Sequence, residues 1–163
     1  MIQKAEKFYT HLLGKKMIND CTLIDGGISI DDRGHVSFVN NFNFNDVKRF
    51  YVVDNHRIGF IRAWHAHKKE SKFVYVASGT ALVCSVQIDN WDKPSNNLKI
   101  NKFVLSSKAP KILCIPKGFA NGFKTLETNT KIFFFSSSSL EESVDDDFRY
   151  AFDFWNPWNE DYR

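Results

Sequence analysis

The chain has 163 residues, a length that suits one domain able to bury its own core without disulfide or metal support. Apolar residues make up 43% of it and aromatic residues 15%, a composition that excludes disordered and fibrous proteins and favours β-sheet over a helical bundle. The net charge of +3 comes from basic residues scattered along the chain, so we expect no nucleic-acid partner, whereas a phosphate-bearing ligand is compatible with it.

The sequence shows neither a membrane span nor a secretion signal. Its apolar runs are far shorter than the roughly 20 residues that cross a bilayer, and residues 1–7 lack the hydrophobic segment of a signal peptide. Cys21, Cys84 and Cys114 are odd in number and lack the spacing of metal ligands. These features predict a cytoplasmic protein with free thiols and no membrane partner.

The elements expected along the chain are almost all strands. Residues 2–14 carry apolar side chains near helical spacing, which predicts a short helix within an N-terminal extension over 1–20. From residue 21 to 139, short apolar runs alternate with turn signals, and Ser78-Gly79 predicts a hairpin turn. The clearest strands are expected at 35–39, 48–54, 60–67, 73–77, 80–88, 99–105, 111–115, 122–126 and 131–136. So many short strands indicate a sandwich or barrel.

The last part of the chain, 140–163, differs in composition from the strands before it. It is acidic up to Tyr150, and its run Asp145–Asp147 is expected to be solvated because it lacks the alternating ligands of a calcium loop. Four aromatic residues follow, and they would form a large exposed patch unless the tail folds back over the barrel or onto a partner chain. They are Phe152, Phe154, Trp155 and Trp158. Nothing marks a second domain, so we expect one domain over 1–163.

One strand carries the residues best suited to chemistry. Residues two apart in a strand share a face, so His65 and His67 are expected to point together, whereas Arg62 and Trp64 share the other face if the strand is regular. Two neighbouring imidazoles suit either proton transfer or metal binding. Lys72 begins the next strand and is expected to reach the same cavity.

Several segments resemble the dTDP-4-keto-6-deoxyhexose 3,4-ketoisomerases. They are Asp32-Arg33-Gly34, Val47-Lys48-Arg49-Phe50-Tyr51 and Arg62-Ala63-Trp64-His65-Ala66-His67-Lys68. Another segment, Ile115-Pro116-Lys117-Gly118-Phe119-Ala120-Asn121-Gly122-Phe123, is similar to one in the related dTDP-4-dehydrorhamnose 3,5-epimerases. The resemblance covers about residues 25–140 and implies an all-β cupin jelly-roll barrel over 21–139, a nucleotide-sugar substrate that is dTDP-linked, and a homodimer.

The resemblance also implies roles for individual residues. His65 and His67 match the catalytic acid–base pair, and Lys72 stands where the epimerases have a lysine. Arg33 and Arg62 are expected near the pyrophosphate. Three further residues are expected to contact the substrate, although Tyr51 and Trp64 suit core packing equally well. These are Tyr51, Trp64 and Asn121.

Two departures from related sequences reduce the number of reactions that the site is expected to catalyse. Metal-binding cupins have a glutamate four or five positions after the second histidine and a further histidine later, whereas here Glu70 follows His67 by three and Asn121 replaces that histidine. Since asparagine is a poor ligand for transition metals, we expect neither a metal nor another cofactor. The tyrosine that acts as the acid in the epimerases belongs to a segment that here reads Lys131–Ser136, without any tyrosine.

We therefore expect a metal-independent 3,4-ketoisomerase that acts through an enediolate, in a surface-polysaccharide or lipopolysaccharide pathway. Three alternatives stay open. The first is a C3 or C3/C5 epimerase of the same substrate class, and the second is a non-catalytic cupin that binds a sugar nucleotide. The third is a metal-dependent cupin oxygenase.

Overall fold

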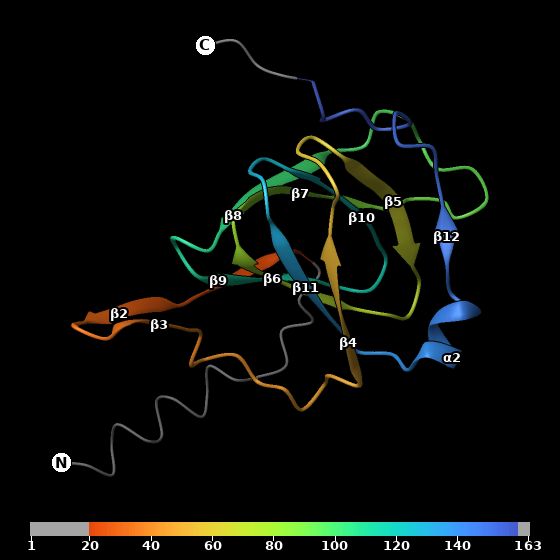
Figure 1. The fold of residues 1–163 in the computed structure, drawn as a ribbon. Helices are drawn as coiled ribbons and strands as arrows, with labels where there is room; N and C mark the ends of the chain where they lie inside the picture. The colour runs from red at the N-terminus through yellow and green to blue at the C-terminus, as the bar shows by residue number, and fades with distance from the viewer. Residues whose placement is uncertain (1–19, 160–163) are drawn as a thin grey trace, which may run out of the picture.

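The computed structural model describes residues 20–159, and the predicted N-terminal helix lies outside them. Two five-stranded antiparallel sheets face each other, and a separate two-stranded hairpin extends from one side (Figure 1). The prediction of an all-β cupin-like fold is confirmed. One short helix, α2 (Leu140–Val144), interrupts the strands near the end of the chain.

The strands of each sheet come from distant parts of the chain. The first sheet has the order β1 (Thr22–Asp25), β9 (Lys111–Ile115), β6 (Lys72–Ser78), β11 (Lys131–Ser136) and β4 (Arg49–Asp54). The second has the order β12 (Phe148–Arg149), β5 (Ile61–His67), β10 (Phe119–Thr125), β7 (Thr80–Gln87) and β8 (Ile100–Ser106). The hairpin consists of β2 (Gly27–Asp31) and β3 (Gly34–Phe38).

The turn at Ser78-Gly79 has a different role from the one predicted. It connects β6 in the first sheet to β7 in the second, so the two strands do not pair and the predicted hairpin is wrong. Gly79 has a φ of +72°, and a Cβ there would lie 2.3 Å from Oγ1 of Thr130. A glycine is therefore required because the corner between the sheets is tight and its backbone conformation is left-handed. Local sequence could not distinguish this corner from a hairpin.

Two apolar clusters hold the structure together, one on each face of the second sheet. The inner cluster fills the space between the sheets and contains Val74, Val83, Leu113, Phe123 and Phe134, among others. The outer cluster lies on the opposite face, where Trp155 and Trp158 of the tail pack against Trp64, Ala66 and Cys84. The prediction that the aromatic tail folds back over the barrel is confirmed for these two tryptophans, whereas Phe152 and Phe154 stay exposed.

The outer face of the first sheet is apolar and open. Phe50 is 61% exposed and Val52 45%, and the ring of Phe50 stacks on that of Phe133 and is tilted against that of Phe135, both on the neighbouring strand. A partner subunit would cover such a face, but the homodimer stays a prediction. Within residues 20–159, no helix has the length and hydrophobicity needed to cross a bilayer.

Candidate active site

A cavity of about 400 Å³ opens between the two sheets at the end covered by α2. Both sheets contribute side chains to it, as do α2 and the residues that lead into β12. The lining residues are Arg49, Tyr51, Val53, Arg62, His65, His67, Lys72, Asn121, Phe123, Phe134, Leu140, Ser143, Val144, Asp147 and Arg149. Six of the eight residues predicted as a site thus meet in one cavity, and Arg33 and Trp64 do not.

A β-bulge decides which side chains of β5 face this cavity. Asn121 pairs with His65 and Phe123 pairs with Arg62, so two residues of β5, Ala63 and Trp64, lie opposite the single residue Gly122. Such a bulge breaks the alternation of faces by one residue. Arg62 therefore lines the cavity together with the two histidines, although a regular strand would have turned it away.

The prediction that Trp64 contacts the substrate is wrong. Its side chain is 1% exposed and belongs to the outer cluster, where its indole Nε1 donates to the carbonyl oxygen of Trp155 at 3.1 Å. The packing alternative left open by the sequence is the one observed. Trp64 is the immediate neighbour of His65, so ordinary strand alternation already places it on the opposite face of the sheet, and the bulge changes only the face of Arg62.

Arg33 lies at the tip of the β2–β3 hairpin rather than in the cavity. Its side chain is 85% exposed and forms an ion pair with Asp31, two residues earlier. An exposed pair of this kind contributes little to stability. The predicted contact of Arg33 with a pyrophosphate stays a prediction, because this residue does not line the cavity of its own chain.

His67 is held in a defined orientation by the chain segment before β12. Its Nδ1 lies 2.6 Å from the backbone carbonyl oxygen of Asp146 and 3.3 Å from Oε2 of Glu70. Because a carbonyl oxygen only accepts hydrogen bonds, Nδ1 carries the proton of the neutral ring. In the neutral ring the lone pair is then on Nε2, the atom at which His67 can accept a proton.

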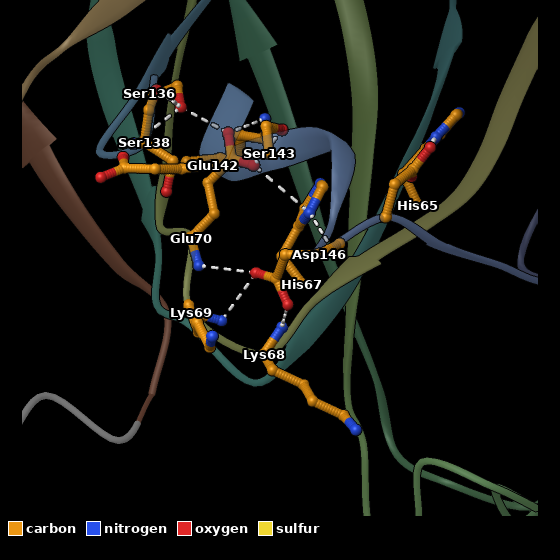
Figure 2. Close-up of polar contacts among 12 residues, drawn as sticks. His65, His67, Lys68, Lys69, Glu70, Ser136, Ser138, Glu142, Ser143 and Asp146 are labelled. Carbon is orange, nitrogen blue, oxygen red and sulfur yellow. Dashed lines mark hydrogen bonds and ion pairs between the residues drawn. The ribbon is translucent and has the colours of Figure 1, made fainter. Parts of the chain in front are cut away.

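Asp146 also fixes the turn between β5 and β6, as Figure 2 shows. Its carboxylate accepts hydrogen bonds from the backbone amides of Lys68, Lys69 and Glu70, at 2.9, 2.8 and 3.2 Å. Asp146 is buried, so the expectation of a solvated acidic run is wrong at this position. The composition of the acidic run gave no signal that Asp146 would be buried, since only the tertiary fold brings this residue to those amides.

His65 sits beside a charge pair that the sequence did not reveal. Its Nδ1 is 3.7 Å from Oδ1 of Asp147, and Asp147 in turn accepts from Arg149 at 2.8 Å. Burial and the charge of Arg149 lower the pKa of His65, and Asp147 opposes them only in part. His65 is therefore neutral near pH 7 and able to accept a proton. The amide of Asn121 donates to the backbone carbonyl of His65 at 3.1 Å and steadies this strand.

Lys72 and Glu70 form a buried ion pair at the cavity wall, with side chains 5% and 0% exposed. Burial lowers the pKa of Lys72, although Glu70 opposes the effect. Burial alone would raise the pKa of Glu70, but hydrogen bonds from Lys72, Ser136 and Ser143 outweigh it and the pKa is lowered. The pair thus places a carboxylate and an ammonium ion beside His67.

The family described as dTDP-4-dehydrorhamnose 3,5-epimerase matches residues 15–152. The chain belongs to this family of dTDP-sugar isomerases. The spore coat polysaccharide biosynthesis protein SpsL of Bacillus subtilis is 28% identical over 109 residues, which are 64% of this chain and 71% of SpsL.

Solved structures with the same fold include members of both activities. The dTDP-4-dehydrorhamnose 3,5-epimerase of Bacillus anthracis, with TDP and PPi bound, is 22% identical, with a TM-score of 0.70 over 89% of this chain and 88% of that one. The TDP-quinovose 3,4-ketoisomerase WlaRB of Campylobacter jejuni is 20% identical, with a TM-score of 0.61 over 84% and 98%. At these identities the likeness shows the fold, and it does not separate the two reactions.

The cavity wall formed by β11 and β4 carries a phenol group, that of Tyr51. Phe134 lines the cavity on β11, and Tyr51 lies next to it on β4, with ring centroids 5.3 Å apart and planes nearly parallel. Burial raises the pKa of Tyr51 to about 12, so its phenol keeps its proton at physiological pH. The sequence placed Tyr51 in the site but did not show that it lines the cavity from the sheet opposite to that of the histidines.

The described part of the chain, residues 20–159, holds no group of three histidine, cysteine or acidic residues arranged to bind a metal ion. His65 and His67 line the same wall, but their Nδ1 atoms already face Asp147 and Asp146. These contacts at Nδ1 orient the two imidazole rings in a way that suits proton transfer. The absence of a metal requirement stays a prediction.

Proposed function

We propose that the protein is a 3,4-ketoisomerase that acts on a nucleotide-linked 4-keto-6-deoxy sugar. The observation that carries this proposal is the position of His65 and His67 on one face of β5, both in the same cavity wall. Two acid–base groups on one side of a sugar ring suit the movement of a proton between neighbouring carbons. Inversion of a carbon instead needs groups on both sides.

The chemistry requires only proton transfers. The carbonyl at C4 acidifies the proton on C3, and one imidazole removes that proton to give an enediolate. A proton then returns to C4, and the hydroxyl proton on the C3 oxygen moves to the C4 oxygen. The carbonyl is left at C3, and no atom or electron is gained or lost. One histidine acts at the carbons, while the other transfers the proton between the oxygens.

Lys72 is the group proposed to stabilise the enediolate, because a fixed cation in a water-poor site favours developing negative charge. Arg62 and Arg149 supply positive charge for a diphosphate at the cavity. Phe123, Phe134 and the exposed Leu140 of α2 give the cavity an apolar side, which suits the C6 methyl group or the base of the substrate. The dTDP-linked form is proposed because relatives with this fold are described with TDP bound.

A specific observation favours a second candidate, epimerisation at C3 or at C3 and C5. Tyr51 lies on the first sheet and His65 on the second, so a phenol and an imidazole line opposite walls of the cavity. A base on one face of the sugar and a proton donor on the other are the requirements for inversion. The match to the epimerase family supports this candidate as well.

The two candidates are separated by an NMR time course with dTDP-4-keto-6-deoxyglucose in deuterium oxide. Migration of the carbonyl from C4 to C3 is the result expected for a ketoisomerase. Deuterium at C3 or C5 with the ketone still at C4 would instead identify an epimerase. Binding without either change would indicate a non-catalytic sugar-nucleotide-binding protein. His65→Ala and His67→Ala are each expected to slow the reaction by about 10²-fold or more, and full activity in both would refute their roles.

A further inference from the structure

Glu70 is fully buried behind the cavity wall formed by His67 and Lys72, and it does not itself line the cavity. Each carboxylate oxygen of Glu70 contacts groups from other elements. At Oε1 these are Nζ of Lys72, Oγ of Ser136 and, at 3.4 Å, Nη2 of Arg49. At Oε2 they are Oγ of Ser143 at 2.6 Å and Nδ1 of His67 at 3.3 Å. The carboxylate thus joins β4, β5, β6, β11 and α2.

A carboxylate buried to this extent is costly unless it is paired and hydrogen-bonded, and replacing such a pair with apolar residues is often stabilising. Its presence beside two proposed catalytic groups therefore calls for a role other than stability. We propose that Glu70 is a positioning residue, which holds Lys72 as an ammonium ion at the cavity wall and fixes the ring of His67 without touching the substrate. The importance of that ammonium ion for turnover rests on the proposed function. The claim that Glu70 keeps Lys72 charged does not depend on which reaction the protein catalyses.

Among the charged and titratable groups around Lys72, Glu70 contributes most to keeping it in the ammonium form. Arg49 of β4 acts against the ammonium form, and Asp147 before β12 acts in its favour. The phenol of Tyr51, on β4, is neutral and lies under the ammonium, with Nζ 5.3 Å from the ring centroid. Without Glu70, burial and Arg49 would thus be opposed mainly by Asp147. The ammonium form of Lys72 would then be lost at a lower pH than in the wild type.

The direct test measures the charge on Lys72 and needs no activity. The Nζ signal of Lys72 is followed against pH by NMR in protein labelled with [15N]lysine and assigned with Lys72→Arg. In Glu70→Gln the midpoint is expected to fall by about one pH unit or more, and an unchanged midpoint would overturn the proposal. If Glu70→Gln does not fold, Glu70→Asp moves the charge away from Lys72 by one methylene and should also lower the midpoint. An unchanged midpoint there would again overturn the proposal.

The matched control is Ser136→Ala. It removes a neutral hydrogen bond to Oε1 of Glu70 but leaves the charge in place, and Ser136 does not line the cavity. We expect Ser136→Ala to lower the melting temperature while the Lys72 midpoint stays as in the wild type. An equal fall of the midpoint in Ser136→Ala and Glu70→Gln would mean that Glu70 acts on Lys72 only through packing, and it would contradict the proposal.

Kinetics then connect the charge to turnover. In Glu70→Gln, kcat is expected to fall by about 10²-fold at neutral pH with little change in KM, and the alkaline limb of kcat against pH should move down with the Lys72 midpoint. If Glu70 had a purely structural role, Glu70→Gln would lower kcat by the same factor at every pH and the alkaline limb would not move. If the midpoint shifts but no dTDP-linked sugar is converted by the wild type, the positioning role stands and the proposed function fails.

Discussion

Nδ1 of His67 lies 2.6 Å from the carbonyl oxygen of Asp146, a residue 79 positions later in the chain. This contact assigns the tautomer of the ring, and the carboxylate of the same Asp146 caps three amides of the β5–β6 turn. One residue of the tail therefore holds both the proposed base and the turn that leads to Lys72. The site is therefore complete only when the tail is docked.

Asp146→Ala should destabilise the fold by about 3 kcal/mol, because three amides lose a charged acceptor at a buried position. Urea denaturation measures the loss. Asp145→Ala is the matched control, since Asp145 is exposed and should cost less than about 0.5 kcal/mol. Equal losses in the two variants would show that the cap contributes nothing.

The acidic limb of kcat/KM should lie below pH 6.5, because the pKa of His65 is lowered from its ordinary value and the neutral ring is the active form. Asp147→Asn removes the carboxylate that favours the imidazolium, so the limb should move to still lower pH. Arg149→Gln removes the opposing cation, so the limb should move to higher pH. Shifts in the same direction in both variants would contradict this assignment.

Gly122→Ala should disrupt the bulge that turns Arg62 into the cavity. A Cβ at this position would lie 2.5 Å from Cβ of Ala63 and 3.1 Å from its Cα. We expect a loss of about 2–3 kcal/mol from overpacking, together with a raised KM because Arg62 is displaced. Stability and KM are measured in a cycle with Ala63→Gly, which removes the shorter contact. The double variant should recover part of the loss, and strict additivity would show that the contact is not the cause.

Trp155→Ala should cost about 3–5 kcal/mol, because the indole is 2% exposed and packs edge-to-face on Trp64 with ring centroids 5.6 Å apart. Phe152→Ala, at a position 54% exposed in the same tail, should cost less than about 1 kcal/mol. Both are measured by chemical denaturation. Similar costs for the two would indicate that the outer cluster does not anchor the tail.

Much of the fold could be predicted from the sequence because its signals are local. Alternating apolar runs placed the strands from β3 to β11 to within a few residues, and only the partner of each strand was missing. The helix α2 was not predicted, although its capping box, Ser139 with Glu142, was readable in the sequence. A five-residue helix with exposed Leu140 and Val144 has no apolar period long enough to predict it.

The sequence by itself determined the chemical groups and the pair of histidines, because residues two apart in a strand share a face whatever the strand pairs with. Only the tertiary structure decided that Arg62 joins them, because one extra residue in β5 against Gly122 reverses the alternation between Arg62 and His65. It alone also brought Asp146, Asp147 and Arg149 to the histidines, since contacts across some eighty residues depend on how the tail packs. Side-chain identity is local, whereas the environment that sets proton affinity is made by distant chain segments that fold together.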